Sequence, residues 1–347
     1  MMKKVKLGGT GLIVSEIGFG GIPIIPLPLE EGAEVVRHCY DLGITFFDTA
    51  NVYGDSEKKV GKALSGVRDK VVIATKTLKR DKETAEKHIW QSLENLKTDR
   101  IDIYQLHNVS NDATLAQVLA PDGAYRAVEK ARKDGTVRFI GFSSHNVKFA
   151  AGVCRRGLFS TVQIPFNFIE TEAAEELFGV ADEMGMGVIG MKPLGGGLLQ
   201  RPDLCMRFLQ QYPQVIPNPG VISKAEMDEI VALYEKRRKL SQADRADMDK
   251  IRADLGTRFC HRCGYCLPCE KGVRIPEALG FKSILKRFQG DFALNFSRDA
   301  LKSAENCDQC GACIERCPYE LPIPEMLDEN LVLYREALKR NTPVSSG

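Results

Sequence analysis

Short apolar runs rich in β-branched residues alternate with longer amphipathic stretches from residue 16 to about residue 222. Eight of these runs have the length and composition of strands, and several are apolar throughout, as expected when both faces of a parallel strand are buried. They are Glu16–Gly20, Thr45–Asp48, Val71–Thr75, Ile101–Leu106, Val137–Phe142, Thr161–Ile164, Gly187–Met191 and Val215–Ile216. The alternation of eight strands with helices predicts an α/β protein built on a (β/α)8 TIM barrel.

Five longer stretches between these runs carry apolar residues every three or four positions, which predicts amphipathic helices around the barrel. They are Glu30–Leu42, Lys82–Leu96, Gly123–Asp134, Thr171–Met184 and Pro202–Gln211. Before the first strand, Val5–Leu7 and Leu12–Val14 flank a glycine-rich turn. We expect these two segments to form a small hairpin.

A glycine pattern at residues 185–190 imitates a nucleotide-binding fingerprint. Gly185, Gly187 and Gly190 have the spacing G-x-G-x-x-G of doubly wound dinucleotide-binding folds. That fingerprint follows a strand and opens a helix, whereas this one closes the 171–184 helix and enters a strand. We therefore expect Gly185 to end a helix and reject a doubly wound fold.

The alternation of strand-like and helical segments ends near residue 223. Two further helices are expected, one running to about Lys239 and one over Ser241–Leu255, and cysteines gather after them. A domain averages about 150 residues, so the chain has room for one large domain and one small one. We expect the barrel over residues 1–255, a small, mainly helical di-cluster ferredoxin-like domain over 256–330, and a carboxyl-terminal helix or tail over 331–347.

Composition excludes several classes of protein. The 44% hydrophobic and 27% charged residues are ordinary for a globular protein, and a net charge of +2 gives no case for nucleic-acid or membrane binding. Neither a signal peptide nor a bilayer-spanning run of roughly 20 residues is visible, so we expect a cytoplasmic protein. Cys39, Cys154 and Cys205 are isolated in apolar surroundings and are expected in the core.

Eight cysteines form two runs near the carboxyl end. The second run has the C-x2-C-x2-C-x3-C-P spacing of bacterial ferredoxins, in which three neighbouring thiolates hold one iron–sulfur cluster and the fourth ligates the other. Applied to both runs, this rule predicts two [4Fe-4S] clusters with crossed ligands. One set is Cys260, Cys263, Cys266 and Cys317, and the other is Cys307, Cys310, Cys313 and Cys269.

Two zinc sites and a disulfide framework are the rival interpretations of these runs. Structural zinc usually takes paired C-x2-C knuckles rather than three or four cysteines in one series. A disulfide framework suits small secreted domains, and this chain has neither a secretory signal nor a small size. Both alternatives therefore fit less well than iron–sulfur clusters.

Polar residues collect at the carboxyl ends of the predicted strands, where the active sites of barrels lie. Each residue alone is more often a packed structural group, but four of them follow consecutive strands at the same end. These four are Asp48, Tyr53, Lys76 and His107, and the next strands bring Ser143, Ser144 and Gln163.

The four residues suit proton delivery to a carbonyl oxygen. A free tyrosine has a pKa near 10, and a neighbouring ammonium such as that of Lys76 is expected to lower it. Asp48 would keep Lys76 charged and in place, and His107 would orient the substrate oxygen. Tyr53 would then be the general acid in reduction and the general base in oxidation.

At these residues the chain resembles the aldo/keto reductases, over about residues 1–240. The matching stretches are Gly43–Glu57, Val71–Lys76, Ile101–His107, Gly141–Asn146, Val162–Asn167 and Lys192–Leu199. The resemblance implies hydride transfer between NADPH or NADH and a small carbonyl substrate, an aldehyde or ketone, without metal or flavin.

The resemblance also implies where the cofactor binds. Ser143, Ser144, Gln163 and Met191 would meet the nicotinamide, and Leu194, Gly195, Ser223 and Lys224 the pyrophosphate and adenosine half. Ser144 replaces a frequent asparagine, Met191 a frequent aromatic residue and Glu226 a frequent arginine. The carboxylate of Glu226 would repel the 2′-phosphate of NADPH, partly offset by Lys224, so NADH and NADPH both stay open.

The cysteine extension is similar to the C-terminal 4Fe-4S di-cluster domain of a subgroup of aldo/keto reductases, on Cys263–Cys269 and Gly272–Pro276. The leading hypothesis is a nicotinamide-dependent carbonyl reductase with two clusters that are structural or that serve a partner electron-carrier protein. The alternative is an electron-transfer or interaction protein whose barrel does not act on carbonyls.

Overall fold

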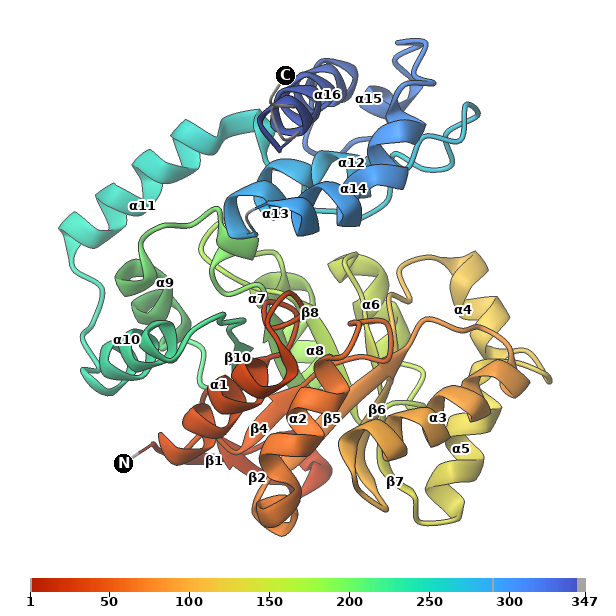
Figure 1. The fold of residues 1–347 in the computed structure, drawn as a ribbon, viewed down its shortest axis with the longest axis vertical. Coiled ribbons are helices and arrows are strands. Elements are labelled where there is room, and N and C mark those ends of the chain that lie inside the picture. Colours follow the sequence, from red (N-terminus) through yellow and green to blue (C-terminus); the bar gives the residue numbers. More distant parts are fainter. Residues whose placement is uncertain (1, 289, 342–347) are drawn as a thin grey trace, which may run out of the picture. The chain divides into compact units, whose positions relative to one another are not determined.

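The computed structural model describes residues 2–288 and 290–341, and its contacts group into two units (Figure 1). The first unit takes the chain up to residue 195 together with 201–240, and the second takes 196–200 together with the chain from 241 onward. The change of unit falls earlier than the expected domain boundary at 255. Residues 342–347 of the expected tail lie outside the described residues.

The first unit is a barrel of eight parallel strands whose order in space is their order in the chain. A parallel bridge between Gly20 and Gly220 joins the first strand to the segment after the last, so the ring is nearly closed. The predicted (β/α)8 barrel is confirmed. The strands are β3 (Phe19–Gly20), β4 (Phe46–Asp48), β5 (Val72–Thr77), β6 (Ile101–Leu106), β7 (Val137–Ser143), β8 (Thr161–Pro165), β9 (Gly187–Met191) and β10 (Val215–Asn218).

Helices surround this ring, and most of them were predicted. The helix expected over Thr171–Met184 is broken at Leu177, and Gly185 follows its second half with a positive φ of 63°, as expected of a helix-ending glycine. Three short helices, α2, α4 and α6, were not predicted. The helices are α1 (Leu29–Asp41), α2 (Ser56–Leu64), α3 (Lys82–Leu96), α4 (Asp112–Leu119), α5 (Ala124–Lys133), α6 (Val147–Cys154), α7 (Ala173–Glu176), α8 (Phe178–Glu183), α9 (Pro202–Leu209) and α10 (Lys224–Glu235).

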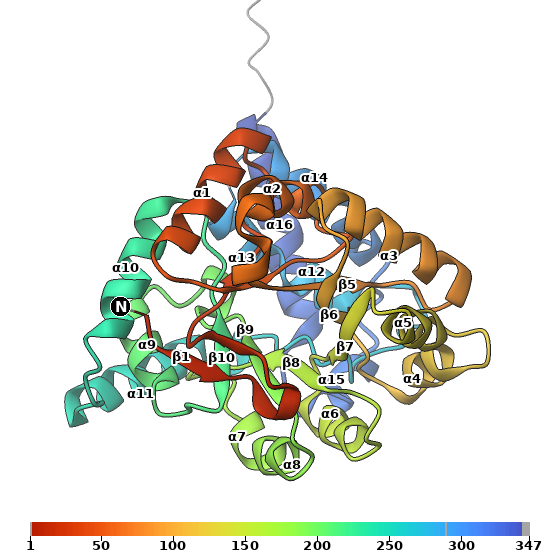
Figure 2. The same cartoon turned by 90° about the horizontal axis from the view of Figure 1, so that it is seen from below.

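The amino-terminal hairpin closes the bottom of the barrel. Strands β1 (Lys4–Lys6) and β2 (Ile13–Ser15) pair antiparallel as expected, and Figure 2 looks onto them from below. Leu7, Leu12 and Val14 pack on side chains from the barrel interior. The turn between the strands lies so close to the chain at Gly187 that a Cβ on Gly8 would be 2.4 Å from a backbone nitrogen. Only glycine fits there.

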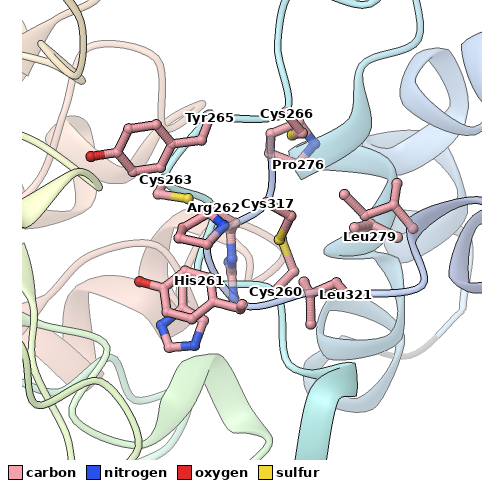
Figure 3. Close-up of a pocket in the computed structure, with 14 residues that line it drawn as sticks. Cys260, His261, Arg262, Cys263, Tyr265, Cys266, Pro276, Leu279, Cys317 and Leu321 are labelled. Carbon is pink, nitrogen blue, oxygen red and sulfur yellow. The ribbon is translucent and has the colours of Figure 1, made fainter. Parts of the chain in front are cut away.

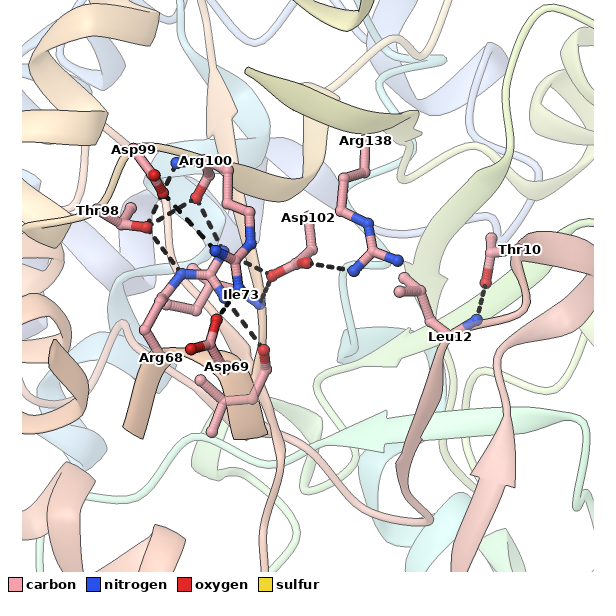
Figure 4. A network of polar contacts seen from close by, with 11 residues as sticks. Thr10, Leu12, Arg68, Asp69, Ile73, Thr98, Asp99, Arg100, Asp102 and Arg138 are labelled. Carbon is pink, nitrogen blue, oxygen red and sulfur yellow. Dashed lines mark hydrogen bonds and ion pairs between the residues drawn. The ribbon is translucent and has the colours of Figure 1, made fainter. Parts of the chain in front are cut away.

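An ionic network around the buried carboxylate of Asp102 lies at the amino-terminal end of the central strands (Figure 4). Asp102, at the start of β6, accepts from Arg68 at 2.7 Å, from Arg138 at 2.9 Å and from the backbone nitrogen of Ile73 at 3.0 Å. Arg68 also donates to the Thr98 hydroxyl and to backbone carbonyls. Each charge in this network has a partner, as a buried ion pair requires.

The second unit is helical and has its own core. The side chains of Leu279, Phe281, Leu301 and Leu327 belong to a cluster that also includes cysteines of both runs. Its helices are α11 (Gln242–Leu255), α12 (Ile275–Leu279), α13 (Phe281–Arg287), α14 (Asp291–Ala304), α15 (Ala312–Glu315) and α16 (Ile323–Asn341). Over the described residues, no helix combines the length and apolar character that a membrane span requires.

Candidate active site and cysteine-lined cavities

Inside the barrel, one carboxylate organises a cluster of buried polar groups. Asp48, the last residue of β4, lies 2.6 Å from the ammonium of Lys76 on β5. It also accepts from the amide of Gln105 on β6 and that of Gln163 on β8, each at 3.1 Å. All four residues are at most 3% exposed. Sequence reasoning missed Gln105, although it stands two positions before His107 and therefore shares its strand face.

The ammonium of Lys76 is held by a second acceptor, the carbonyl oxygen of Thr49, at 2.6 Å. Burial lowers the pKa of Lys76, and the carboxylate of Asp48 opposes that shift by favouring the charged form. A lysine in this position can give up its proton when its partner is removed, which an arginine cannot do.

Tyr53 lies on the turn after β4, close to this ion pair. The turn is anchored by Ser56, whose hydroxyl donates to the Gly21 carbonyl and whose backbone nitrogen donates to the Tyr53 carbonyl. The Lys76 ammonium is 5.2 Å from the centre of the Tyr53 ring, and the ring of His107 meets Tyr53 edge to face at 5.7 Å. The structure thus brings together the four residues that the sequence singled out.

The pKa of Tyr53 moves in the opposite direction from the one expected. Burial of the phenol raises its pKa, and the negative charge of Asp48 raises it further. The expectation that Lys76 lowers this pKa is therefore wrong for the resting protein. The consequence is a phenol that stays protonated at neutral pH and is ready to act as an acid.

His107 follows β6 and is a neutral imidazole. Burial lowers its pKa well below the usual value, and the positive charges of Lys76, Arg80 and Lys192 lower it further. Its Nδ1 is buried and has no hydrogen-bond partner in the described part of the chain. A neutral ring of this kind can orient a substrate oxygen without carrying charge.

The residues expected at the nicotinamide differ in how many of their hydrogen-bonding atoms already have a partner in the protein. The Oε1 of Gln163 is buried and unpartnered within the described residues, so it can accept from a carboxamide NH2. Ser143 accepts from the backbone nitrogen of Asn108 and keeps its own proton. Ser144 is engaged on all sides, because its hydroxyl contacts Ser110 and both backbone groups of Asn146.

Beyond the nicotinamide, the expected contact residues lie on two segments. Met191 ends β9, and Leu194 and Gly195 belong to the turn that follows it, where Gly195 has a φ of 58°. Ser223 caps the start of α10, and Lys224 forms an ion pair with Glu34 at 2.9 Å. The carboxylate of Glu226 folds back onto the backbone nitrogen of Ile222 at 2.9 Å.

The two cysteine runs meet in two cavities of the second unit. The first cavity is lined by Cys260, Cys263, Cys266 and Cys317, which Figure 3 shows together. Apolar side chains complete its wall, among them Leu279 and Leu321. His261 stacks on Tyr319 at the same cavity, with ring centres 3.7 Å apart. Three cysteines thus come from the first run and one from the second.

The second cavity has a volume of about 410 Å³ and takes three cysteines from the second run and one from the first. It is lined by Cys307, Cys310, Cys313 and Cys269, together with Val273, Ile275 and Leu327. Cys310 is exposed and Cys313 is buried. An ion pair between Lys271 and Asp308 at 3.2 Å lies among the residues that line this cavity.

The cysteine side chains line these cavities without converging on a point. Among the described residues, no three His, Cys, Asp or Glu side chains are arranged to hold a single metal ion. A zinc ion needs its thiolates about 2.3 Å from one centre, whereas an iron–sulfur cube takes each thiolate at a different iron atom. Burial raises the pKa of Cys263 to about 11 and that of Cys266 to about 12, so both are neutral thiols before any metal binds.

Comparison with known proteins decides the family. The family model described as "Aldo/keto reductase family" matches residues 16–204, more than half of the chain. The chain belongs to the aldo/keto reductase family. A second model, "4Fe-4S dicluster domain", matches residues 259–321, so this aldo/keto reductase carries a ferredoxin-type extension that includes both cysteine runs.

Curated relatives match the barrel. The chain is 32% identical over 212 residues to L-galactose dehydrogenase of Arabidopsis thaliana, covering 56% of this chain and 66% of that protein. It is 29% identical over 215 residues to a probable aldo-keto reductase of Glycine max, covering 56% of this chain and 60% of that one. The chain therefore spans less than two thirds of the length of these two relatives.

Solved structures share the fold. An aldo-keto reductase from Bacillus halodurans in its holo form superposes with a TM-score of 0.62 at 24% identity, covering 72% of this chain and 96% of that one. An aldo-keto reductase from Klebsiella pneumoniae, solved in complex with NADPH, superposes with a TM-score of 0.61 at 23% identity. The match covers 72% of this chain and 95% of that one.

Proposed function

We propose that this aldo/keto reductase reduces a small aldehyde or ketone with NADH or NADPH, and that Tyr53 delivers the proton. The observation that carries the proposal is the buried pair of Lys76 and Asp48, 2.6 Å apart, placed beside the Tyr53 ring. The raised pKa of Tyr53 keeps its proton available at neutral pH. A proton donor of this kind contributes about 10²–10⁴-fold to such a reaction.

The chain's own residues account for the proton and the orientation. The neutral ring of His107 and the Tyr53 hydroxyl both bind the carbonyl oxygen, and the proton passes from Tyr53 to that oxygen as the C=O double bond becomes a single bond. The Lys76 ammonium stabilises the phenolate left behind. The nicotinamide, when bound, supplies the hydride that the carbonyl carbon gains.

The free groups at the barrel mouth fit a nicotinamide. The unpartnered Oε1 of Gln163 would accept from the carboxamide, and the Ser143 hydroxyl would donate to it. Ser144 has no free hydrogen-bonding capacity and would shape the turn. Met191 would lie against the ring, and Leu194, Gly195, Ser223 and Lys224 would line the path of the diphosphate and adenosine.

NADH and NADPH would both be used, with NADH bound more tightly. The Klebsiella protein was solved with NADPH, but here the charge of Lys224 is shared with Glu34, and Glu226 puts a carboxylate in the first turn of α10. Both features disfavour a 2′-phosphate. Titration of each cofactor into the protein measures the ratio of the two Kd values.

The two cysteine quartets would hold two [4Fe-4S] clusters. One quartet is Cys260, Cys263, Cys266 and Cys317, and the other is Cys269, Cys307, Cys310 and Cys313. Such clusters, when bound, supply one-electron transfer, whereas a hydride carries two electrons. They are therefore structural or exchange electrons with a carrier protein.

The experiment for the barrel is Tyr53→Phe, with Tyr40→Phe on α1 as the matched control. Carbonyl reduction should fall about 10²–10⁴-fold in the first variant and stay unchanged in the second, while cofactor affinity is kept in both. Retention of wild-type turnover by Tyr53→Phe would show that the mechanism is wrong. A wild-type protein that reduces no carbonyl would favour the electron-transfer alternative.

The experiment for the second unit is anaerobic purification with iron and sulfide analysis. Two clusters predict about eight of each per chain, and zinc sites predict neither. Adding NADH or NADPH then tests the role of the clusters. Bleaching of their absorbance would show that they receive electrons from the nicotinamide, and no response would favour a structural or partner-facing role.

A further inference from the structure

Arg80 is a partly buried cation beside the candidate active site. It lies on the loop between β5 and α3, and its guanidinium donates to the backbone carbonyl of His107 at 2.8 Å and to that of Asn108 at 3.1 Å. Burial lowers its pKa to about 10. No carboxylate within residues 2–288 and 290–341 lies at ion-pair distance from it. Its positive charge therefore has no carboxylate of the described residues beside it. The two carbonyls occupy only part of its five N–H donors, so other donors remain for a ligand.

A second cation reaches over the same end of the barrel. Lys192 follows β9 with a positive φ of 55°, and its carbonyl is held by the Asn167 amide at 3.0 Å and the Gly195 nitrogen at 2.9 Å. Its ammonium lies 2.7 Å from Nε2 of His145, which follows β7. Because β8 separates β7 from β9, this pair spans the carboxyl end of β8.

The charges around His107 have one sign. Lys76, Arg80 and Lys192 all act on its ring as positive charges. Lys76 is neutralised by Asp48. The carboxylate of Glu170 accepts from the Asn167 amide at 2.7 Å, and the same amide donates to the Lys192 carbonyl. Arg80, with no carboxylate at ion-pair distance among the described residues, thus leaves a positive charge beside the place where the substrate oxygen would bind.

We propose that Arg80 and Lys192 bind a carboxylate carried by the substrate, so that the substrate is an oxo acid. This inference rests on the proposed function and deepens it. A guanidinium fork and an ammonium are the two groups that bind carboxylates most strongly. A partly buried arginine beside the orienting histidine is stabilised when an anion takes the place of its lost water. The carboxylate takes no part in the bond changes, and its role is to fix the carbonyl between Tyr53 and His107.

The test compares acids with their neutral esters on the full holoprotein. The pairs are pyruvate against methyl pyruvate and succinic semialdehyde against its methyl ester, each with NADH and with NADPH. In at least one pair the wild type should show a kcat/KM at least tenfold higher for the acid. Arg80→Met and Lys192→Met should each lower that ratio at least tenfold, mainly through KM of the acid.

Two further variants separate binding from folding effects. Lys79→Met removes the exposed neighbouring cation and should leave the ratio unchanged, and Arg80→Lys should restore part of it. Equal kcat/KM values for acid and ester in both wild-type pairs would overturn the proposal. An acid-to-ester ratio of kcat/KM that neither Arg80→Met nor Lys192→Met changes would also overturn it. The same holds if these two variants alter only the Kd of the cofactor.

Failure of the proposed function would be recognised separately. If no carbonyl compound is turned over, the binding of oxamate and oxamide is measured by calorimetry instead. Tighter binding of oxamate, weakened at least tenfold in Arg80→Met and Lys192→Met, would support the carboxylate site without any reaction. Equal binding of the two compounds, or an oxamate affinity that neither variant alters, would overturn it.

Discussion

The two ends of the barrel each bury a carboxylate against a cation, but the cations differ. At the amino-terminal end, Asp102 lies between Arg68 and Arg138, and each of the three side chains has at least one partner of opposite charge. At the carboxyl end, Asp48 holds Lys76, and polar atoms of Gln105 and Gln163 stay unpartnered among the described residues. One end is complete by itself, whereas the other has capacity left for a ligand.

The choice of cation explains how each end would respond to losing its carboxylate. An arginine keeps its charge at every accessible pH, so Arg68 would be left as a buried, uncompensated ion. A buried lysine can release its proton, and burial already lowers the pKa of Lys76. The pairing at the amino-terminal end therefore suits stability, and the pairing at the carboxyl end suits the chemistry proposed above, in line with the division found in barrels generally.

Asp102→Asn tests the stable end and should have the largest effect. Removing one partner of a buried ion pair costs about 3–5 kcal/mol of unfolding free energy. Chemical denaturation followed by circular dichroism measures that loss. Activity per folded molecule should stay near the wild-type value. A loss below about 1 kcal/mol, the range of an exposed ion pair, would show that the network is not the support described.

Asp48→Asn is the matched change at the other end. Activity should fall about 10²–10³-fold, or about 3–4 kcal/mol in the barrier, because Lys76 loses its charge and its position. The unfolding free energy should change by less than about 1 kcal/mol, since a neutral lysine can stay buried. Steady-state kinetics and the same denaturation experiment measure both. A variant that unfolds as readily as Asp102→Asn would erase the contrast.

Acidification should lower the free energy of unfolding, because His107 resists protonation in the folded protein. Its pKa is lowered in the folded protein, so below pH 6.5 the unfolded chain takes up a proton that the folded one refuses. Stability therefore falls as pH drops, by at most about 1.4 kcal/mol per pH unit and about 2 kcal/mol between pH 6.5 and 5. His107→Gln should remove this part of the slope. Parallel curves for the two proteins would contradict the assignment.

The fold follows from the sequence wherever burial is uniform. The central barrel strands are buried on both faces and mostly apolar, which makes runs such as Ile101–Leu106 and Gly187–Met191 recognisable to the residue. The helices α4 and α6 were missed although Asn111 and Asn146 cap them, a signal that was available. The break falls at Leu177, two residues before Gly179, and the apolar periodicity that runs through both halves does not indicate it.

The candidate site follows from the sequence only in part. Position at the strand ends was enough to select Asp48, Tyr53, Lys76 and His107, which the structure brings together. The direction of the Tyr53 pKa shift could not be foreseen, because it depends first on how deeply the phenol is buried and then on the negative charge of Asp48. Arg80 lies in a loop, where no periodicity indicates which way a side chain points.

The crossed cavities have a consequence for how the second unit is assembled. Each cavity takes three cysteines from one run and one from the other. Joining Cys266 to Cys317 through a shared cluster encloses the whole intervening chain in a loop and brings Cys269 and Cys313 into the same neighbourhood. Closing this loop costs conformational entropy, and the same closure brings together the cysteines of both cavities, so the cost is incurred only once. If each quartet holds one cluster, as proposed, filling of one should favour filling of the other, and removal of a single cysteine should weaken binding at both.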